Sequence, residues 1–269
     1  MRRTKIVSTL GPASNSLEVL RKMIAAGVDI VRLNFSHGTP DEKKSLVTLV
    51  RQAAKEEGKI VGILADLQGP KIRVAKFKNG KIFLKENAEF VLDAVLAKDA
   101  GDENVVGIDY KELPQDVKPE DVLLLDDGRV VLVVKKIDGT RIICRVQVGG
   151  ELSNNKGINR QGGGLSAGAL TDKDREDLKT AVSLKADYVA ISFVRSKDDV
   201  EETKALIAKE GGNAGVIAKI ERIEAMVPDV LKGIIKSSDG IMVARGDLGV
   251  EIGDAEVPAA QKFMIDCAA

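Results

Sequence analysis

Two hydrophobic periods alternate along the chain. Short apolar runs typical of buried strands are followed by segments in which apolar residues recur every three or four positions, as in helices that bury one face. The predicted strands cover residues 5–10, 29–36, 60–65, 188–194, 215–221 and 241–244. The predicted helices cover residues 17–26, 40–57, 171–184 and 197–210, and a last helix begins near Val257. Strands that alternate with helices predict a parallel sheet of the α/β class.

The alternation is interrupted in the middle of the chain. From Ala75 to about Gly157, short runs of Val, Ile and Leu are separated by dipeptides typical of hairpin turns. These dipeptides are Asn79-Gly80, Asp127-Gly128, Asp138-Gly139 and Gly149-Gly150. The pattern predicts an inserted all-β domain over residues 73–160, between two α/β segments at 1–72 and 161–269. The glycines at 162–164 form either a flexible linker or a hinge, and the sequence favours neither.

The polar residues of the predicted strands gather at the strands' carboxyl ends. This polarity favours a (β/α)8 TIM-type barrel, in which the functional site lies at that face. An open doubly wound sheet would more typically carry a glycine-rich fingerprint after its first strand, and Gly11-Pro12 is not one. A closed barrel needs eight strands, so we expect a barrel truncated after about six strand–helix units.

Composition narrows the classes of partner. The chain has 41 basic and 41 acidic residues and no block of Lys or Arg, which argues against an extended nucleic-acid surface. Cys144 and Cys267 lie far apart in the sequence, which argues against a disulfide framework or a zinc site and favours a reducing compartment. No signal-like apolar core or long apolar run is present, so we expect a cytoplasmic protein without a membrane partner.

Charged residues stand at the ends of two neighbouring predicted strands. Lys219 and Glu221 share one strand face, and Asp247 follows the next strand. Lys219 with Glu221 alone is more often a strand-end ion pair, but together with Asp247 and Arg32 the set suits a magnesium-bound phosphate. The apolar run at 241–244 stops at Arg-Gly-Asp-Leu-Gly, which predicts a loop whose backbone approaches a ligand.

Six motifs in chain order resemble the pyruvate kinase family. They are TKIV (4–7) with Gly11-Pro12, RLNFSHG (32–38), DLQGPKIR (66–73), NKG (155–157), KIE (219–221) and MVARGDLG (242–249). The resemblance covers essentially all 269 residues. It implies a (β/α)8 barrel with a mobile β-rich lid after its third strand, and a homotetramer for the full-length protein.

The resemblance also implies an activity. In this family phosphoenolpyruvate and ADP are converted to pyruvate and ATP, the last step of glycolysis, with Mg²⁺ and possibly Mn²⁺ as cofactor. Such phosphoryl transfer depends mostly on positioning and charge neutralisation. Two further readings stay open: a phosphoenolpyruvate- and magnesium-binding barrel fragment without turnover, and a magnesium-dependent aldolase or mutase of the phosphoenolpyruvate/pyruvate class. The β-rich insert speaks against the aldolase, which would also show no ADP dependence.

Residue roles follow from the matched motifs. Lys219 and Arg32 would hold the transferred phosphoryl group as the catalytic cations. Glu221 and Asp247 would bind magnesium, and the backbone amides of Gly246 and Asp247 would receive the substrate carboxylate. The residues implied as nucleotide contacts are Asn34, His37, Arg73 and Lys156. His37 is the sole histidine, but this transfer needs no imidazole base.

One departure from the family concerns potassium. Many members place a monovalent cation among four residues, which here are Asn34, Ser36, Asp66 and Leu67. Those members have Glu where this chain has Lys71. A lysine ammonium is a compact point charge, so we expect Lys71 to occupy the pocket and potassium not to be required. The family's last two strands and C-terminal domain have no counterpart, so we expect this chain alone to be weakly active or inactive.

Overall fold

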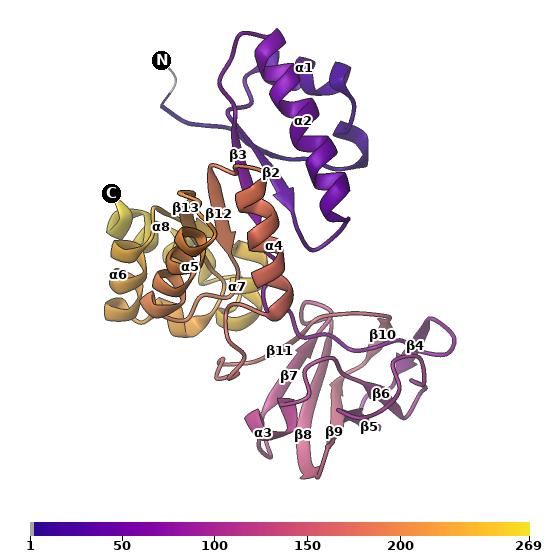
Figure 1. Cartoon of the computed structure of the whole chain (residues 1–269). Helices are drawn as coiled ribbons and strands as arrows, with labels where there is room; N and C mark the ends of the chain where they lie inside the picture. The colour runs from indigo at the N-terminus through magenta and orange to yellow at the C-terminus, as the bar shows by residue number, and fades with distance from the viewer. Residues whose placement is uncertain (1–2) are drawn as a thin grey trace.

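A curved parallel sheet forms the centre of the α/β part of the protein (Figure 1). The computed structural model describes residues 3–269. The six strands are β1 (Val7–Thr9), β2 (Ile30–Asn34), β3 (Gly62–Asp66), β12 (Tyr188–Ile191), β13 (Gly215–Ile220) and β14 (Gly240–Val243). They lie side by side in this order, and every neighbouring pair is parallel. The predicted α/β class and the curled part of a TIM-type barrel are confirmed.

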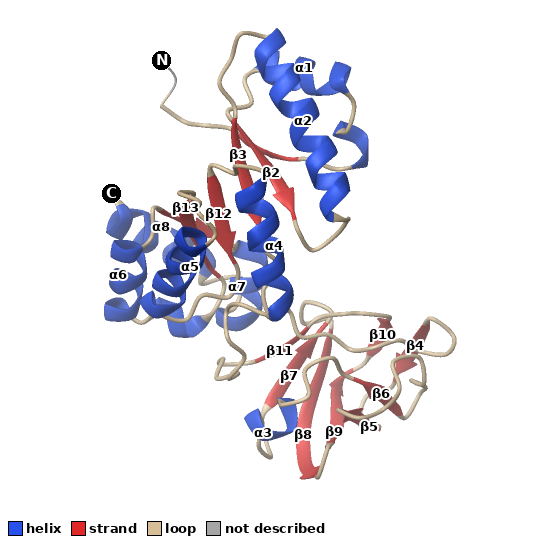
Figure 2. Ribbon diagram, viewed as in Figure 1, coloured by secondary structure: helices blue, strands red, loops and turns tan. Residues whose placement is uncertain are grey.

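Helices follow the strands, and most of them pack on one face of the sheet (Figure 2). They are η1 (Pro12–Ser14), α1 (Leu17–Ala26), α2 (Pro40–Glu56), α4 (Asp172–Ser183), α5 (Lys197–Lys209), η2 (Ile223–Met226), α6 (Pro228–Ser237), α7 (Arg245–Ile252) and α8 (Val257–Ala268). Side-chain oxygens cap the first turns of four of them, from Ser16, Thr39, Thr171 and Ser196. The core lies between the sheet and these helices.

Parallel register carries the polar strand ends to one edge of the sheet. Asn34 of β2 pairs with Asp66 of β3, and Lys219 of β13 pairs with Met242 of β14. Because all six strands point the same way, their last residues meet at a common face. The residues just before those ends are deeply buried, as in Leu33, which is 1% exposed. A rigid apolar layer therefore supports the polar edge.

The inserted segment forms sheets of its own. Its elements are β4 (Lys81–Leu84), β5 (Glu89–Asp93), β6 (Val105–Gly107), α3 (Leu113–Asp116), β7 (Val122–Leu125), β8 (Val130–Asp138), β9 (Arg141–Val148), β10 (Gly150–Ser153) and β11 (Ile158–Arg160). One sheet has the order β11-β7-β8-β9-β5-β6, and β10 pairs with β4 in another. This part has a separate hydrophobic core and stands apart from the curved sheet (Figure 1). The limits at 73 and 160 stay predictions.

Two of the four predicted hairpins are wrong. Asp127-Gly128 and Asp138-Gly139 do join paired strands, β7 to β8 and β8 to β9. Asn79-Gly80 instead leads into β4, whose partner β10 lies about seventy residues further on. Gly149-Gly150 marks the place where the chain leaves one sheet for the other. A Cβ at Gly149 would lie 2.4 Å from the Leu84 carbonyl oxygen, so this close approach requires glycine.

The predicted loop after β14 is also wrong, because α7 begins at Arg245. Two glycines lower the helix propensity of this segment, so the sequence pattern hides the helix. Burial offsets that disadvantage, since Leu248 is fully buried and Glu251 is 8% exposed. Helix α6, between β13 and β14, was likewise not predicted. The six strands of the curved sheet and the start of α8 at Val257 agree with the sequence pattern to within a few residues.

The sheet is open in the described part of the chain. Within residues 3–269, β1 and β14 are its two edges and pair with no further strand. Ile6 and Val7, at the β1 edge, are 41% and 48% exposed. Among the same residues no helix combines the length and apolar character needed to cross a bilayer.

The β domain's separate core yields a prediction from two phenylalanines. Phe90 on β5 is fully buried, whereas Phe83 on β4 is 68% exposed. We expect Phe90→Ala to lower the free energy of unfolding by about 3–5 kcal/mol, because it leaves a cavity in that core. The matched change Phe83→Ala should cost less than about 0.5 kcal/mol. Urea unfolding followed by circular dichroism measures both, and equal losses would contradict the separate core.

Candidate active site

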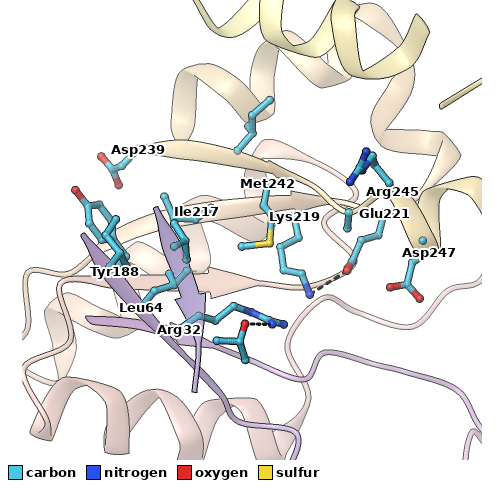
Figure 3. Close-up of a pocket in the computed structure, with 16 residues that line it drawn as sticks. Arg32, Leu64, Tyr188, Ile217, Lys219, Glu221, Asp239, Met242, Arg245 and Asp247 are labelled. Atoms are coloured by element: carbon cyan, nitrogen blue, oxygen red, sulfur yellow. Dashed lines mark hydrogen bonds and ion pairs between the residues drawn. The ribbon is translucent and has the colours of Figure 1, made fainter. Parts of the chain in front are cut away.

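A cavity of about 240 Å³ lies at the carboxyl ends of the sheet strands. It is lined by Arg32, Asn34, Ser36, His37, Asp66, Leu67, Gln68, Lys71, Arg73, Ser192, Phe193, Lys219, Glu221 and Asp247. It shares four of these residues with a cleft of about 710 Å³ inside the curved sheet, shown in Figure 3. Tyr188 and Asp239 lie at the far end of that cleft from Asp247.

Lys219 and Glu221 form a buried ion pair. The Lys219 ammonium lies 2.9 Å from Glu221 Oε1, and the two side chains are 12% and 1% exposed. Burial alone would lower the pKa of Lys219, but the Glu221 and Asp66 carboxylates outweigh it and hold that pKa above its ordinary value. The ammonium therefore stays charged at neutral pH.

Arg32 is held by partners on both neighbouring strands. Its guanidinium donates from Nε to Asp66 Oδ2 at 2.6 Å and from an Nη to Thr9 Oγ1 at 2.9 Å. A second nitrogen also contacts Asp66 Oδ2. Asp66 is 2% exposed, and its Oδ1 lies 3.5 Å from the Lys219 ammonium. Asp66 thus links the two cations and fixes their separation.

The first turn of α7 borders the cleft. Gly246 and Asp247 lie in that turn, where backbone N–H groups have no partner within the helix. No side chain caps this helix end. A helix N-terminus with free amides is a ready anion site. The structure therefore offers a carboxylate or phosphate a place beside the Asp247 side chain, even though the segment is a helix and not the predicted loop.

The donor set suits a hard divalent cation. Burial raises the pKa of Glu221, Lys219 opposes this, and the nearby Asp247 charge adds to the rise. A bound cation would relieve the repulsion between these two carboxylates. Within residues 3–269, no group of three or more His, Cys, Asp or Glu side chains is placed to hold a metal. Magnesium commonly takes only one or two protein carboxylates and completes its shell with water and phosphate oxygens. The carboxylates of Glu221 and Asp247 therefore fit a magnesium site.

Lys71 lines the same cavity as the four expected pocket residues, and its ammonium pairs with Asp247. Its ammonium is 3.3 Å from Asp247 Oδ1. Among the described residues no hydrogen bond or ion pair joins it to the four expected pocket residues Asn34, Ser36, Asp66 and Leu67, although all of them line the same cavity. Asn34 Oδ1 accepts the Ser36 amide at 2.9 Å and so shapes the turn after β2.

The predicted nucleotide contacts are only partly brought together. Asn34, His37 and Arg73 line the cavity. Arg73 also donates to the Asn155 carbonyl at 3.0 Å, which ties it to the returning chain of the β domain. Lys156 does not line this cavity, because its ammonium pairs with Asp126 Oδ1 at 2.8 Å within the β domain.

Three contributors were missed from the sequence: Thr9, Ser192 and Phe193. Ser192 and Phe193 follow β12 and touch Lys219 and Glu221. Ser192 carried the same signal as the predicted residues, a polar side chain after a buried run, in Tyr188-Val-Ala-Ile-Ser-Phe. Phe193 contributes its backbone amide, which no residue pattern shows.

Comparisons with known proteins point to one family. A family model described as the pyruvate kinase barrel domain matches residues 1–269. The chain is 55% identical over 266 residues to pyruvate kinase of Haemophilus influenzae, covering 98% of this chain and 56% of that protein. It is 53% identical to pyruvate kinase II of Salmonella typhimurium, with 98% and 55% covered. Against pyruvate kinase of Corynebacterium efficiens it is 45% identical, with 99% and 56% covered. The chain thus spans just over half the length of these relatives.

Glu251 on α7 generates a pH prediction. Burial raises the pKa of Glu251 to about 7, Glu224 adds to the rise, and the Ile223 amide and Arg222 oppose it. Because the folded state keeps this proton when the unfolded state has lost it, stability falls as pH rises from about 4.5 to about 7. Glu251→Gln removes this loss and keeps an acceptor for the Ile223 amide.

We therefore expect Glu251→Gln to gain stability relative to wild type between pH 5 and pH 8, by at most about 2–3 kcal/mol. Urea unfolding at both pH values measures the difference. The exposed side chain Glu103 supplies the control variant, Glu103→Gln, which should show no such change. An equal response from the two variants would refute the assignment.

Proposed function

Because this chain belongs to the pyruvate kinase family, we propose that its site carries out phosphoryl transfer from phosphoenolpyruvate to ADP, giving pyruvate and ATP, the last step of glycolysis. The observation that supports this most is the convergence of Lys219, Arg32, Glu221 and Asp247 on one cavity. Two cations and two acids match a phosphate that arrives with a divalent cation.

The two cations have distinct roles in the proposal. Arg32 is fixed by Thr9 and Asp66, so its guanidinium holds the phosphoryl oxygens in a preset direction. Lys219 keeps its proton and donates to a phosphoryl oxygen as charge builds on the migrating group. An ADP phosphate oxygen attacks phosphorus, the bond from phosphorus to the enol oxygen breaks, and the enolate takes a proton at carbon to give pyruvate.

The acids and α7 hold the other end of the substrate. Glu221 and Asp247 would bind Mg²⁺ or Mn²⁺, which when bound neutralises charge on the substrate's carboxylate and phosphate oxygens. The amides of Gly246 and Asp247 would receive the substrate carboxylate at the start of α7. Asn34, His37 and Arg73 would contact the nucleotide from the lid side, where Arg73 already bonds the returning chain at Asn155.

Lys156 would reach the nucleotide only when the β domain moves as a lid. In this structure Lys156 is paired with Asp126 and lies outside the cavity. The glycines at 162–164, where the chain returns to the barrel, all have positive φ, which glycine adopts readily, and we propose them as the hinge of this movement. Closure by such a lid excludes water from the transfer.

A binding role without turnover is the second candidate for this chain alone. It is favoured by the open interior of the sheet, where the cleft of about 710 Å³ continues from the site between β1 and β14. A site needs rigid support to hold its reacting groups. We therefore propose weak activity or none for these 269 residues, and catalysis by the natural full-length protein, which we propose to be a cytoplasmic homotetramer without nucleic-acid partners.

The catalytic role of Lys219 is tested in the natural full-length protein. Lys219→Ala should lower ADP-dependent pyruvate formation at least about a thousandfold, because it removes the buried cation on the transferred group. The exposed side chain Lys232 on α6 supplies the matched control, Lys232→Ala, which should stay within about twofold of wild type. A lactate-dehydrogenase-coupled assay measures both. Wild-type turnover in Lys219→Ala, or pyruvate formation without ADP, would contradict the proposal.

Independence from potassium is tested with the same assay. Since Lys71 supplies an ammonium inside the cavity, we expect activity in potassium-free buffer to lie within about threefold of that with potassium. Lys71→Glu removes that cation, so this variant should become dependent on potassium. An increase of orders of magnitude when potassium is added to the wild type would overturn the expectation.

A further inference from the structure

The turn after β12 contacts both members of the Lys219–Glu221 pair. Ser192 Oγ accepts a hydrogen bond from the Lys219 ammonium at 2.7 Å. The backbone amide of the next residue, Phe193, donates to Glu221 Oε2 at 2.6 Å. Ser192 and Phe193 are 1% and 8% exposed, so both contacts are shielded from water. Two consecutive residues therefore hold the cation and the acid from the same side.

The direction of the serine hydroxyl is fixed by a third group. Ser192 Oγ donates its only hydrogen to the Leu67 carbonyl oxygen at 2.8 Å, in the segment after β3. A hydroxyl has one donor and two acceptor sites, so a lone pair of Ser192 is left to face Lys219. Removal of this hydroxyl would leave the buried Leu67 carbonyl without this donor and the ammonium without its shortest hydrogen-bond partner.

The backbone conformation at this turn is special. Phe193 has a φ of +56°, which is uncommon for a bulky residue and costs free energy that the surrounding contacts must offset. Gly69 packs directly against the turn. A Cβ at Gly69 would lie 2.7 Å from Ser192 Cβ and 3.0 Å from the Phe193 ring. The Gly69 amide is in turn bonded to the buried Asp174 at 3.0 Å, so the turn rests on a fixed support.

A count of donors shows what this arrangement leaves available. A lysine ammonium has three hydrogens, and the Lys219 nitrogen lies 2.7 Å from Ser192 Oγ, 2.9 Å from Glu221 Oε1 and 3.5 Å from Asp66 Oδ1. The third is too long for a good hydrogen bond, and Asp66 Oδ1 has no hydrogen-bond partner in the described structure. One N–H of Lys219, which lines the cavity, is thus left without a good hydrogen bond and is available to a ligand oxygen.

We propose that the turn of Ser192 and Phe193 positions the Lys219–Glu221 pair, and that Ser192 is the positioning residue that directs the free N–H of Lys219 at the transferred phosphoryl group. The inference rests on the proposed function and adds a residue to it. Without the turn, the Lys219 ammonium would contact both carboxylate oxygens of Glu221 at closer range. The Phe193 amide prevents this by occupying Glu221 Oε2, and Ser192 prevents it by holding the ammonium.

The test compares three variants of the natural full-length protein. Ser192→Ala removes the hydroxyl, and Ser192→Cys keeps nearly the same volume but offers a poor acceptor. Thr203→Val is the matched control, because the Thr203 hydroxyl is fully buried and donates to the Asp199 carbonyl at 2.8 Å on α5, away from the cavity. It therefore reproduces the loss of a buried hydroxyl without any contact with Lys219.

For both Ser192 variants we expect kcat to fall about 10- to 100-fold, while KM for phosphoenolpyruvate changes less than about threefold, because the charge stays but its direction is lost. Thr203→Val should leave both constants within about twofold. A wild-type-like kcat in Ser192→Cys would show that Ser192 only fills space, and would overturn the inference. A rise in KM with kcat unchanged would also overturn it.

A second readout needs neither metal nor turnover. In crystal structures of the metal-free protein, the Lys219 ammonium should move by more than about 1 Å, or occupy two rotamers, in both Ser192 variants but not in Thr203→Val. An unmoved Lys219 would refute the inference. If the wild type shows no phosphoryl transfer but Lys219 moves as expected, the proposed function fails and the positioning role of Ser192 stands.

Discussion

The buried contact between Lys219 and Glu221 is the interaction on which the site depends. Removal of two opposite charges from water is unfavourable, and their attraction offsets it only when further hydrogen bonds satisfy both groups. Here Ser192 bonds the ammonium, the Phe193 amide bonds the carboxylate, and Asp66 adds a second negative charge nearby. The pair is thus held in a fixed geometry with one donor left over, which makes it suited to a phosphate ligand.

Parallel strand order is the constraint that assembles the remaining groups. Arg32, Asp66 and Lys219 come from β2, β3 and β13, and β13 lies more than a hundred residues beyond the other two strands in sequence. Their strands end at one face because all are parallel, and the buried residues behind them keep that face rigid. Helix α7 then brings Asp247 and its first-turn amides to the same place from beyond β14. The chemistry of the site follows from the topology.

Much of this arrangement could be predicted from sequence because buried parallel strands have a strong signal. Continuous apolar runs located all six strands, and polar residues at their ends located Lys219, Glu221 and Arg32. The α7 helix was not predicted because its glycines weaken the local helix signal, whereas the burial of Leu248 in the tertiary structure stabilises the helix. The pairing of β4 with β10 was not predicted because the sequence of a strand does not indicate which distant strand it pairs with. Phe193 escaped because a positive φ and a backbone amide are invisible in a list of side chains.

The central claim is that the ammonium of Lys219 and the carboxylates of Glu221 and Asp247 serve one phosphate and one divalent cation. A crystal structure of the natural full-length protein with phosphoenolpyruvate and Mn²⁺ tests this most directly, because manganese is located by its anomalous scattering. The account predicts one manganese peak at roughly 2.1 Å from an oxygen of Glu221 and an oxygen of Asp247, with the phosphoryl oxygens on Lys219 and Arg32. A manganese peak away from both acids, or a phosphate bound out of reach of Lys219, would contradict it.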